Sequence, residues 1–289
     1  MNQQITNSSK YIPVFLHIPK NAGTYILSCA HNIFRRYLNE LNPNKFTMND
    51  LGYRILLINY ENNTISIALC YEPNYLTNKK FKQIPYNEYS NSIELGDFLC
   101  EISQGKLKIF SLFIESEGFK FINTGLFDNF FKITDKLPLY YAIFRDPLER
   151  ALSLFNYLKS TDSSHEPTHG SITSSTFENY IKSSQAEDSW LIRSIVGISD
   201  SKQISDEDFQ KTCIFLDKAK IMDIKYTDEL IVHSFNECYL LNARFNKTIM
   251  RTNKTKQNNI NIQEVDPVSF NIFKNRAAYD YKLYNRYIS

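Results

Sequence analysis

A lysine in a tight turn near the start of the chain is the first residue whose position suggests a chemical role, the binding of an anion. Lys20 follows the apolar run from Tyr11 to Ile18, which is typical of a strand covered on both faces, and Pro19 ends that run. Thr24 adds a hydroxyl, and the apolar residues after Gly23 recur at the spacing of one helix face, so the turn leads into a helix N-terminus. Small residues in the turn let backbone N–H groups approach an anion closely: Asn21, Ala22 and Gly23. This stretch predicts a phosphate- or sulfate-binding loop.

The loop differs from the nucleoside-triphosphate loop G-x-x-x-x-G-K-[ST], in which the lysine follows the second glycine. Here Lys20 precedes a single glycine, Gly23. The chain therefore lacks the usual sequence motif for binding ATP and magnesium, and a nucleotide-dependent phosphotransferase is the weaker alternative. Since no acidic cluster suggests a metal site, we expect no metal.

A second set of polar residues follows another apolar run. Residues Leu139–Phe144 are typical of a strand that ends at Arg145, and Pro147 suits the first turn of the helix that follows. A guanidinium can bind two phosphate oxygens and a hydroxyl can add one hydrogen bond, so Arg145 and Ser153 can meet one anion. The alternative is that the charges between Arg145 and Arg150 form surface ion pairs at a helix start.

Both stretches resemble one family. His17–Thr24, with the sequence HIPKNAGT, resembles the cofactor loop of the membrane-type carbohydrate sulfotransferases, the group with the heparan sulfate 2-O- and 6-O-sulfotransferases. Arg145–Ser153, RDPLERALS, is similar to the second cofactor element of that family. The resemblance implies transfer of a sulfuryl group from 3′-phosphoadenosine 5′-phosphosulfate (PAPS) to a hydroxyl, and we expect the acceptor to be a carbohydrate. A nucleotide- or glycan-binding regulator without turnover is the alternative from another class.

The resemblance also implies roles for individual residues. Lys20 is the catalytic cation, and Arg145 and Ser153 hold the 3′-phosphate. The segment Met250–Lys256 resembles a loop that closes over the nucleotide, although a solvated basic loop is the alternative. The residues implied in binding the 5′-phosphosulfate are Lys20, Asn21, Ala22, Gly23, Thr24 and Tyr25. Those implied in the closing loop are Arg251, Asn253 and Thr255.

The resemblance does not assign the base that takes the proton of the acceptor, because the histidine of the family's G-H-x-x-x-G-L segment is missing from residues 121–126. We name Glu115 first, since it follows the apolar run Leu107–Ile114 and active sites of open α/β sheets lie at the carboxyl ends of strands. The alternative for Glu115 is a solvated loop acid. His17 comes second, and a structural histidine at the end of a buried strand is its alternative.

The order of apolar runs and helix faces predicts an α/β fold, P-loop-like, with three layers and a central parallel sheet of four or five strands flanked by helices. We expect a single domain over residues 1–289. Residues 50–105 are the candidate acceptor-binding insertion, because tyrosines on its expected loops could pack on sugars: Tyr75, Tyr86 and Tyr89. The alternative is that these tyrosines only cover the surface or pack in the core, since tyrosine is common throughout the chain.

Within residues 50–105, Tyr53–Tyr60 and Thr64–Cys70 read as a hairpin. Further along, we expect a short helix in Ala186–Gly197, from which Trp190 and Arg193 could reach the site. A helix capped by Ser205 should follow, then a strand over Ile221–Tyr226 and a helix from Thr227 to Leu241.

Composition narrows the partners. With 33 basic and 31 acidic side chains, the net charge of +2 leaves no broad basic field for nucleic acid. No run approaches the roughly 20 apolar residues of a membrane span, and five widely spaced cysteines fit reduced thiols. Eukaryotic members of the family that the chain resembles are usually anchored in the Golgi by a membrane span, so the resemblance implies a bacterial cytosolic enzyme. The sequence His165-Glu-Pro-Thr-His169 matches a zinc-protease motif, but Pro167 interrupts the helix that the motif requires.

Overall fold

A computed structural model describes residues 10–23, 25–26, 29–30, 53–60, 63–71, 92–104, 109–115, 119–122, 127–160, 173–183, 189–198, 202–239 and 262–288. The described strands form one sheet of seven, in the order β4-β2-β3-β5-β1-β6-β7. The strands are β1 Tyr11–His17, β2 Tyr53–Tyr60, β3 Asn63–Tyr71, β4 Ser92–Glu94, β5 Ile109–Glu115, β6 Leu137–Phe144 and β7 Ala219–Asp223.

Four neighbouring strands, β5, β1, β6 and β7, run parallel to one another. This confirms an α/β fold with a parallel central sheet. The whole sheet is nevertheless mixed, because the expected hairpin β2–β3 is present and adds to the same sheet, with β3 antiparallel to β5. Antiparallel strands need only a short connection, which the two residues between β2 and β3 supply.

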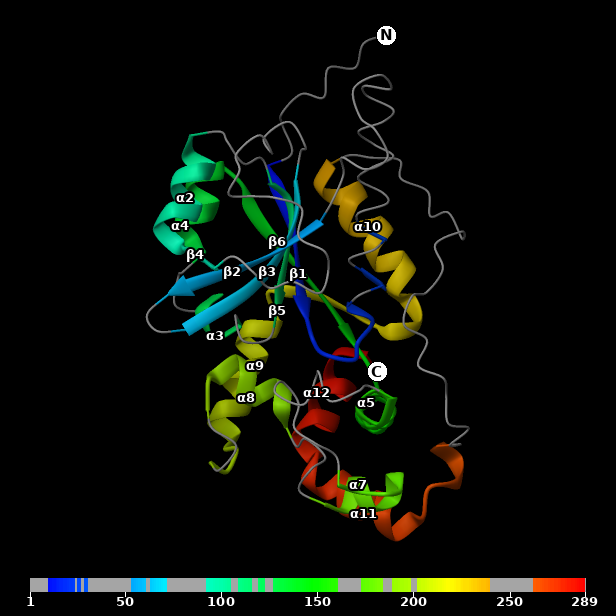
Figure 1. Cartoon of the computed structure of the whole chain (residues 1–289). Coiled ribbons are helices and arrows are strands. Elements are labelled where there is room, and N and C mark those ends of the chain that lie inside the picture. The colour runs from blue at the N-terminus through cyan, green and yellow to red at the C-terminus, as the bar shows by residue number, and fades with distance from the viewer. Residues whose placement is uncertain are drawn as a thin grey trace.

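Helices cover both faces of the sheet, with α10 on one side and α2, α3, α4 and α9 on the other (Figure 1). The described helices are α2 Leu95–Ser103, α3 Phe119–Ile122, α4 Asp128–Thr134, α5 Pro147–Ser160, α7 Phe177–Lys182, α8 Trp190–Val196, α9 Asp206–Leu216, α10 Thr227–Tyr239, α11 Pro267–Arg276 and α12 Ala278–Ile288. The 3-10 turns are η5 Ile224–Tyr226 and η6 Ile262–Glu264.

Alternate side chains of β1 enter different layers, as the period of a strand requires. Val14 and Leu16 are buried in a core shared with α3, α4, α8, α9 and α12. Phe15 faces the other way, with its ring centroid 5.7 Å from that of Tyr141 on β6 and 6.4 Å from that of Phe235 on α10. Strand β1 is therefore buried on both faces, as its continuous apolar sequence predicts.

A second apolar core joins α5, α7 and α11, three helices that lie below the sheet in Figure 1. Its largest members are aromatic rings from α5, α7 and α11: Phe155, Phe177, Tyr180 and Phe273. Because α5 follows directly from the end of β6, this core holds α5 beside the carboxyl edge of the sheet.

Most helix ends agree with the expectations. Ser205 caps α9 in a capping box with Asp208, and Gly197 ends α8 with a φ of 73°. The expected role of Thr227 was wrong. Thr227 is itself the first residue of α10, with helical dihedrals (φ −56°, ψ −40°), whereas a capping residue has non-helical ones. Its hydroxyl donates to the carbonyl of Ile224 at 2.6 Å and closes the 3-10 turn η5. The strand expected over Ile221–Tyr226 is displaced towards the N-terminus, because β7 runs from Ala219 to Asp223 and the 3-10 turn η5 follows.

Within the described ranges, no helix has both the length and the apolar character needed to cross a bilayer.

Candidate anion-binding site

The turn between β1 and the next helix has an unusual backbone. Lys20 and Ala22 have φ values of 66° and 63°, in the left-handed region that residues other than glycine seldom adopt. The N–H of Asn21 donates to the carbonyl of Ile18 at 3.1 Å, and the N–H of Ile26 donates to the carbonyl of Ala22 at 2.9 Å to start the helix. Strained residues of this kind cost about 1–3 kcal/mol each and cluster at functional sites.

Asn21 holds the turn to the neighbouring strand. Its side chain is buried, and its Nδ2 donates to the carbonyl of Ile143 on β6 at 2.8 Å. The turn after β1 is thereby tied to the end of β6, the strand that leads to Arg145. A rigid link between the two elements is needed if both are to bind one ligand.

Gly23 has a steric reason to lack a side chain. A Cβ at this position would lie 1.9 Å from Nε2 of His17, so the imidazole packs directly against the glycine. The ring of His17 is half-buried, and its centroid lies 4.9 Å from that of Phe113 on β5. His17 therefore shapes the base of the turn, whatever further role it has.

Lys20 and Arg145 bring two cations together beside this turn. Burial, and secondarily the charge of Arg145, lower the pKa of Lys20 to about 8. The ammonium of Lys20 lies 3.7 Å from the ring centroid of Tyr157 on α5. Arg145 forms an ion pair with Glu149, at 3.3 Å between Nε and Oε2, and about a quarter of its side chain is exposed. An anion that bound here would relieve the repulsion between the two cations.

Ser153 lies on the same stripe of α5 as these contacts. Residues four apart on a helix are neighbours on one face, and Glu149, Ser153 and Tyr157 follow that spacing. Since Glu149 contacts Arg145 and Tyr157 contacts Lys20, the half-buried Ser153 lies between the two contacts. The turn and this face of α5 therefore present a lysine, an arginine and a hydroxyl.

Asp146 fixes the start of α5. Its Oδ1 accepts hydrogen bonds from the N–H groups of Leu148 and Glu149, at 2.9 and 3.1 Å. Burial raises the pKa of this carboxyl, although the two hydrogen bonds oppose that change. Asp146 is thus a helix cap, and it sets the position of Arg145 by holding the turn that precedes α5.

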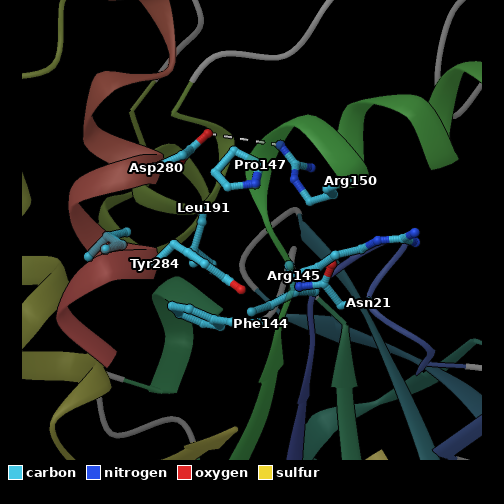
Figure 2. A pocket seen from close by; sticks show the side chains of 10 residues that line it. Asn21, Phe144, Arg145, Pro147, Arg150, Leu191, Asp280 and Tyr284 are labelled. Carbon is cyan, nitrogen blue, oxygen red and sulfur yellow. Dashed lines mark ion pairs between the residues drawn. The ribbon is translucent and has the colours of Figure 1, made fainter. Parts of the chain in front are cut away.

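A small cavity of about 30 Å³ lies behind the turn, between α5 and α12. Figure 2 shows Asn21 and Phe144 at its base, Asp280 and Tyr284 on α12, and the side chain of Arg145 extending away from that helix. The cavity has room for a water molecule and none for a nucleotide. One wall of the cavity is a buried ion pair between α5 and α12, with Arg150 Nη2 4.0 Å from Asp280 Oδ2. We therefore interpret the cavity as part of the packing behind the turn and not as a ligand site.

Three other residues named from the sequence lie around this turn. Glu115 is the last residue of β5 and stands in register with His17, so the two candidate bases end neighbouring strands. The hydroxyl of Tyr25 donates to Oδ1 of Asp228 on α10 at 2.7 Å, which anchors the helix after the turn.

Two residues that we expected to reach the site make other contacts. Arg193 donates from Nη1 to the carbonyl of Lys202 at 2.7 Å, and Trp190 packs beneath Arg150. The remaining named residues lie outside the described ranges: Thr24, Tyr75, Tyr86, Tyr89, His165, His169, Arg251, Asn253 and Thr255.

Tyr157 and Asp146 are the contributors that sequence reasoning missed. The signal for Tyr157 was present, because it follows Ser153 by four residues on an expected helix. The signal for Asp146 was weaker, since an aspartate between an arginine and a proline reads equally well as an ion-pair partner. No three His, Cys, Asp or Glu side chains of the described chain gather as a metal would require, and the expectation of no metal stays a prediction.

The chain was compared with family models, curated proteins and solved structures, and none of them matches it.

Proposed function

We propose that the protein is a sulfotransferase that moves the sulfuryl group of PAPS to a hydroxyl, with a carbohydrate as the expected acceptor. The observation that carries the proposal is that two cations lie close together at the same edge of the sheet. Lys20 lies in a left-handed turn after β1, and Arg145 follows the neighbouring parallel strand β6. Two separate anionic groups on one ligand would suit two cations held on adjacent strands.

The residues of the two elements divide the binding work. The turn from Lys20 to Gly23 offers an ammonium and closely approachable backbone for the phosphosulfate. Arg145 and Ser153 offer a guanidinium and a hydroxyl on the neighbouring element for the 3′-phosphate. We propose that the turn acts as a P-loop-like anion-binding loop. The residues to which the sequence resemblance gives further binding roles are Thr24, Tyr25, Arg251, Asn253 and Thr255.

Catalysis in this proposal is mainly positioning and charge stabilisation, as in phosphoryl transfer. Lys20 donates a hydrogen bond to the phosphate oxygen that leaves sulfur while the acceptor oxygen forms a new bond to sulfur. A base takes the proton that the acceptor hydroxyl loses. Glu115 remains our first candidate and His17 the second, because both stand at the ends of neighbouring strands beside the turn.

The wider assignment follows from the same proposal. We propose that the enzyme is cytosolic, that residues 50–105 help to bind the acceptor within a single domain, and that neither nucleic acid nor metal takes part. The hairpin β2–β3 within residues 50–105 adds to the sheet on the β5 side, next to Glu115. That position would bring an acceptor bound there towards the candidate base.

Calorimetry with 3′-phosphoadenosine 5′-phosphate, adenosine 5′-phosphate and ATP is the first test. Preference for the first nucleotide supports a sulfotransferase site, whereas preference for ATP would favour a phosphotransferase. Turnover of radiolabelled PAPS with a panel of sugar hydroxyls then separates an enzyme from a nucleotide-binding regulator. Comparing sulfated metabolites in cells with and without the protein would identify the acceptor class.

A further inference from the structure

We propose that Tyr157 is a positioning residue, whose ring holds the ammonium of Lys20 beside the left-handed turn through a cation–π contact. The ammonium lies 3.7 Å from the ring centroid, well within the distance of about 6 Å at which such contacts act. Tyr157 comes from α5 and Lys20 from the turn after β1, so the contact joins the two elements of the anion-binding site.

A neutral ring is an apt partner for this lysine. Burial and the nearby guanidinium of Arg145 both disfavour the charged form of Lys20. Among the described residues no carboxylate forms an ion pair with Lys20, and Glu149 instead pairs with Arg145. An aromatic face stabilises a cation without cancelling its charge, so Lys20 stays available to an incoming anion.

The backbone gives this contact a further purpose. A lysine side chain carries a compact charge at the end of a flexible four-carbon chain. Without a contact at its far end, that charge would sample many directions. The left-handed φ of Lys20 sets the direction in which its side chain leaves the turn, and Tyr157 receives the far end. Two fixed points therefore define where the positive charge lies before a ligand binds. That this charge serves sulfuryl transfer rests on the proposed function, whereas the contact itself does not.

The direct test is an NMR titration of Lys20 in protein labelled with ¹³Cε-lysine, with the signal assigned by its loss in Lys20→Arg. Tyr157→Phe keeps the ring and should titrate as the parent does. Tyr157→Leu and Tyr157→Met remove the ring, so the pKa of Lys20 should fall by about one unit, a tenfold change in its protonation equilibrium. Circular dichroism checks that each variant is folded, and two apolar replacements guard against the failure of one.

A matched control comes from α12, where Lys282 lies 4.5 Å from the ring centroid of Tyr279. Tyr279→Leu removes a comparable lysine–tyrosine contact on the α9 side of α12 and should leave the titration of Lys20 unchanged. Unchanged titration of Lys20 in both ring-deleted Tyr157 variants would overturn the proposal. An equal change in Tyr157→Phe would also overturn it, because the hydroxyl would then be responsible.

A second readout links the contact to the proposed reaction. With saturating PAPS, Tyr157→Phe should keep the parental kcat, and Tyr157→Leu should lower kcat about tenfold at pH 8 while Tyr279→Leu leaves it unchanged. The NMR titration needs no nucleotide, so the two proposals can fail separately. If the pKa of Lys20 does not change in the ring-deleted variants, the role of Tyr157 is refuted. If the parent does not turn over PAPS, only the proposed function is refuted.

Discussion

Replacing Gly23 by alanine should displace the ring of His17. The new Cβ would lie 1.9 Å from Nε2 and 2.0 Å from Cδ2 of His17, where optimal contacts of carbon atoms are about 3.5–4.0 Å. The imidazole must therefore move by more than an ångström, although Phe113 packs against it. Overpacking of this kind costs about 1–3 kcal/mol. Alanine is favoured over glycine in a helix by about 1 kcal/mol, so we expect a net loss of about 0–2 kcal/mol.

Urea denaturation of a double-mutant cycle measures this effect. In a His17→Ala background the obstacle is gone, so Gly23→Ala should be neutral or stabilising, with a coupling free energy of at least about 1 kcal/mol between the two positions. The variant should also bind nucleotide more weakly, because the turn must shift with the ring. If Gly23→Ala keeps the parental stability in both backgrounds, the packing of His17 on the turn is refuted.

Three further predictions concern the turn and α5. Lys20→Ala should lower kcat by at least about 100-fold, equivalent to about 3 kcal/mol, and nucleotide affinity by less; parental turnover in single-turnover assays would remove Lys20 from the mechanism. Because the pKa of Lys20 is about 8, its charge is present below that pH and lost above it, so affinity for 3′-phosphoadenosine 5′-phosphate should fall as the pH rises through 8. Lys20→Arg stays charged and should lack that decline in calorimetry, and an identical decline would assign it to another group. Asp146→Ala should lower the free energy of unfolding by about 0.5–2 kcal/mol through loss of the α5 cap, Asp146→Asn should largely restore it, and equal stability of both variants and the parent would contradict the cap.

The sequence was most informative where local chemistry alone decides the structure. Continuous apolar runs ended by Pro19 and Arg145 identified β1 and β6, because a strand buried on both faces needs no polar residue until it reaches the edge of the sheet. Pro147 and Gly197 marked a helix start and a helix end for reasons that lie in their own backbones. The capping role of Ser205 was equally predictable, since its partner in the capping box, Asp208, lies only three positions away.

Features that depend on distant residues were not predictable in this way. The hairpin β2–β3 was expected, but its addition to the parallel strands as part of one mixed sheet depends on pairing with β5 about 40 residues later. The packing of His17 on Gly23 depends on the left-handed turn between them, which no propensity for lysine or alanine suggests. Thr227 has a typical capping residue type, and only the turn at Asp223 shows that its hydroxyl serves the preceding carbonyl.

In the proposed function, Lys20 and Arg145 form one site for a nucleotide with phosphates at both the 5′ and the 3′ positions. Calorimetry of the parent and Arg145→Ala with 3′-phosphoadenosine 5′-phosphate and with adenosine 5′-phosphosulfate tests it most directly. The parent should prefer the nucleotide with the 3′-phosphate, and Arg145→Ala should lose about 1.5–3 kcal/mol of binding to that nucleotide alone. Equal binding of both nucleotides by the parent, or an unchanged preference in Arg145→Ala, would contradict the claim.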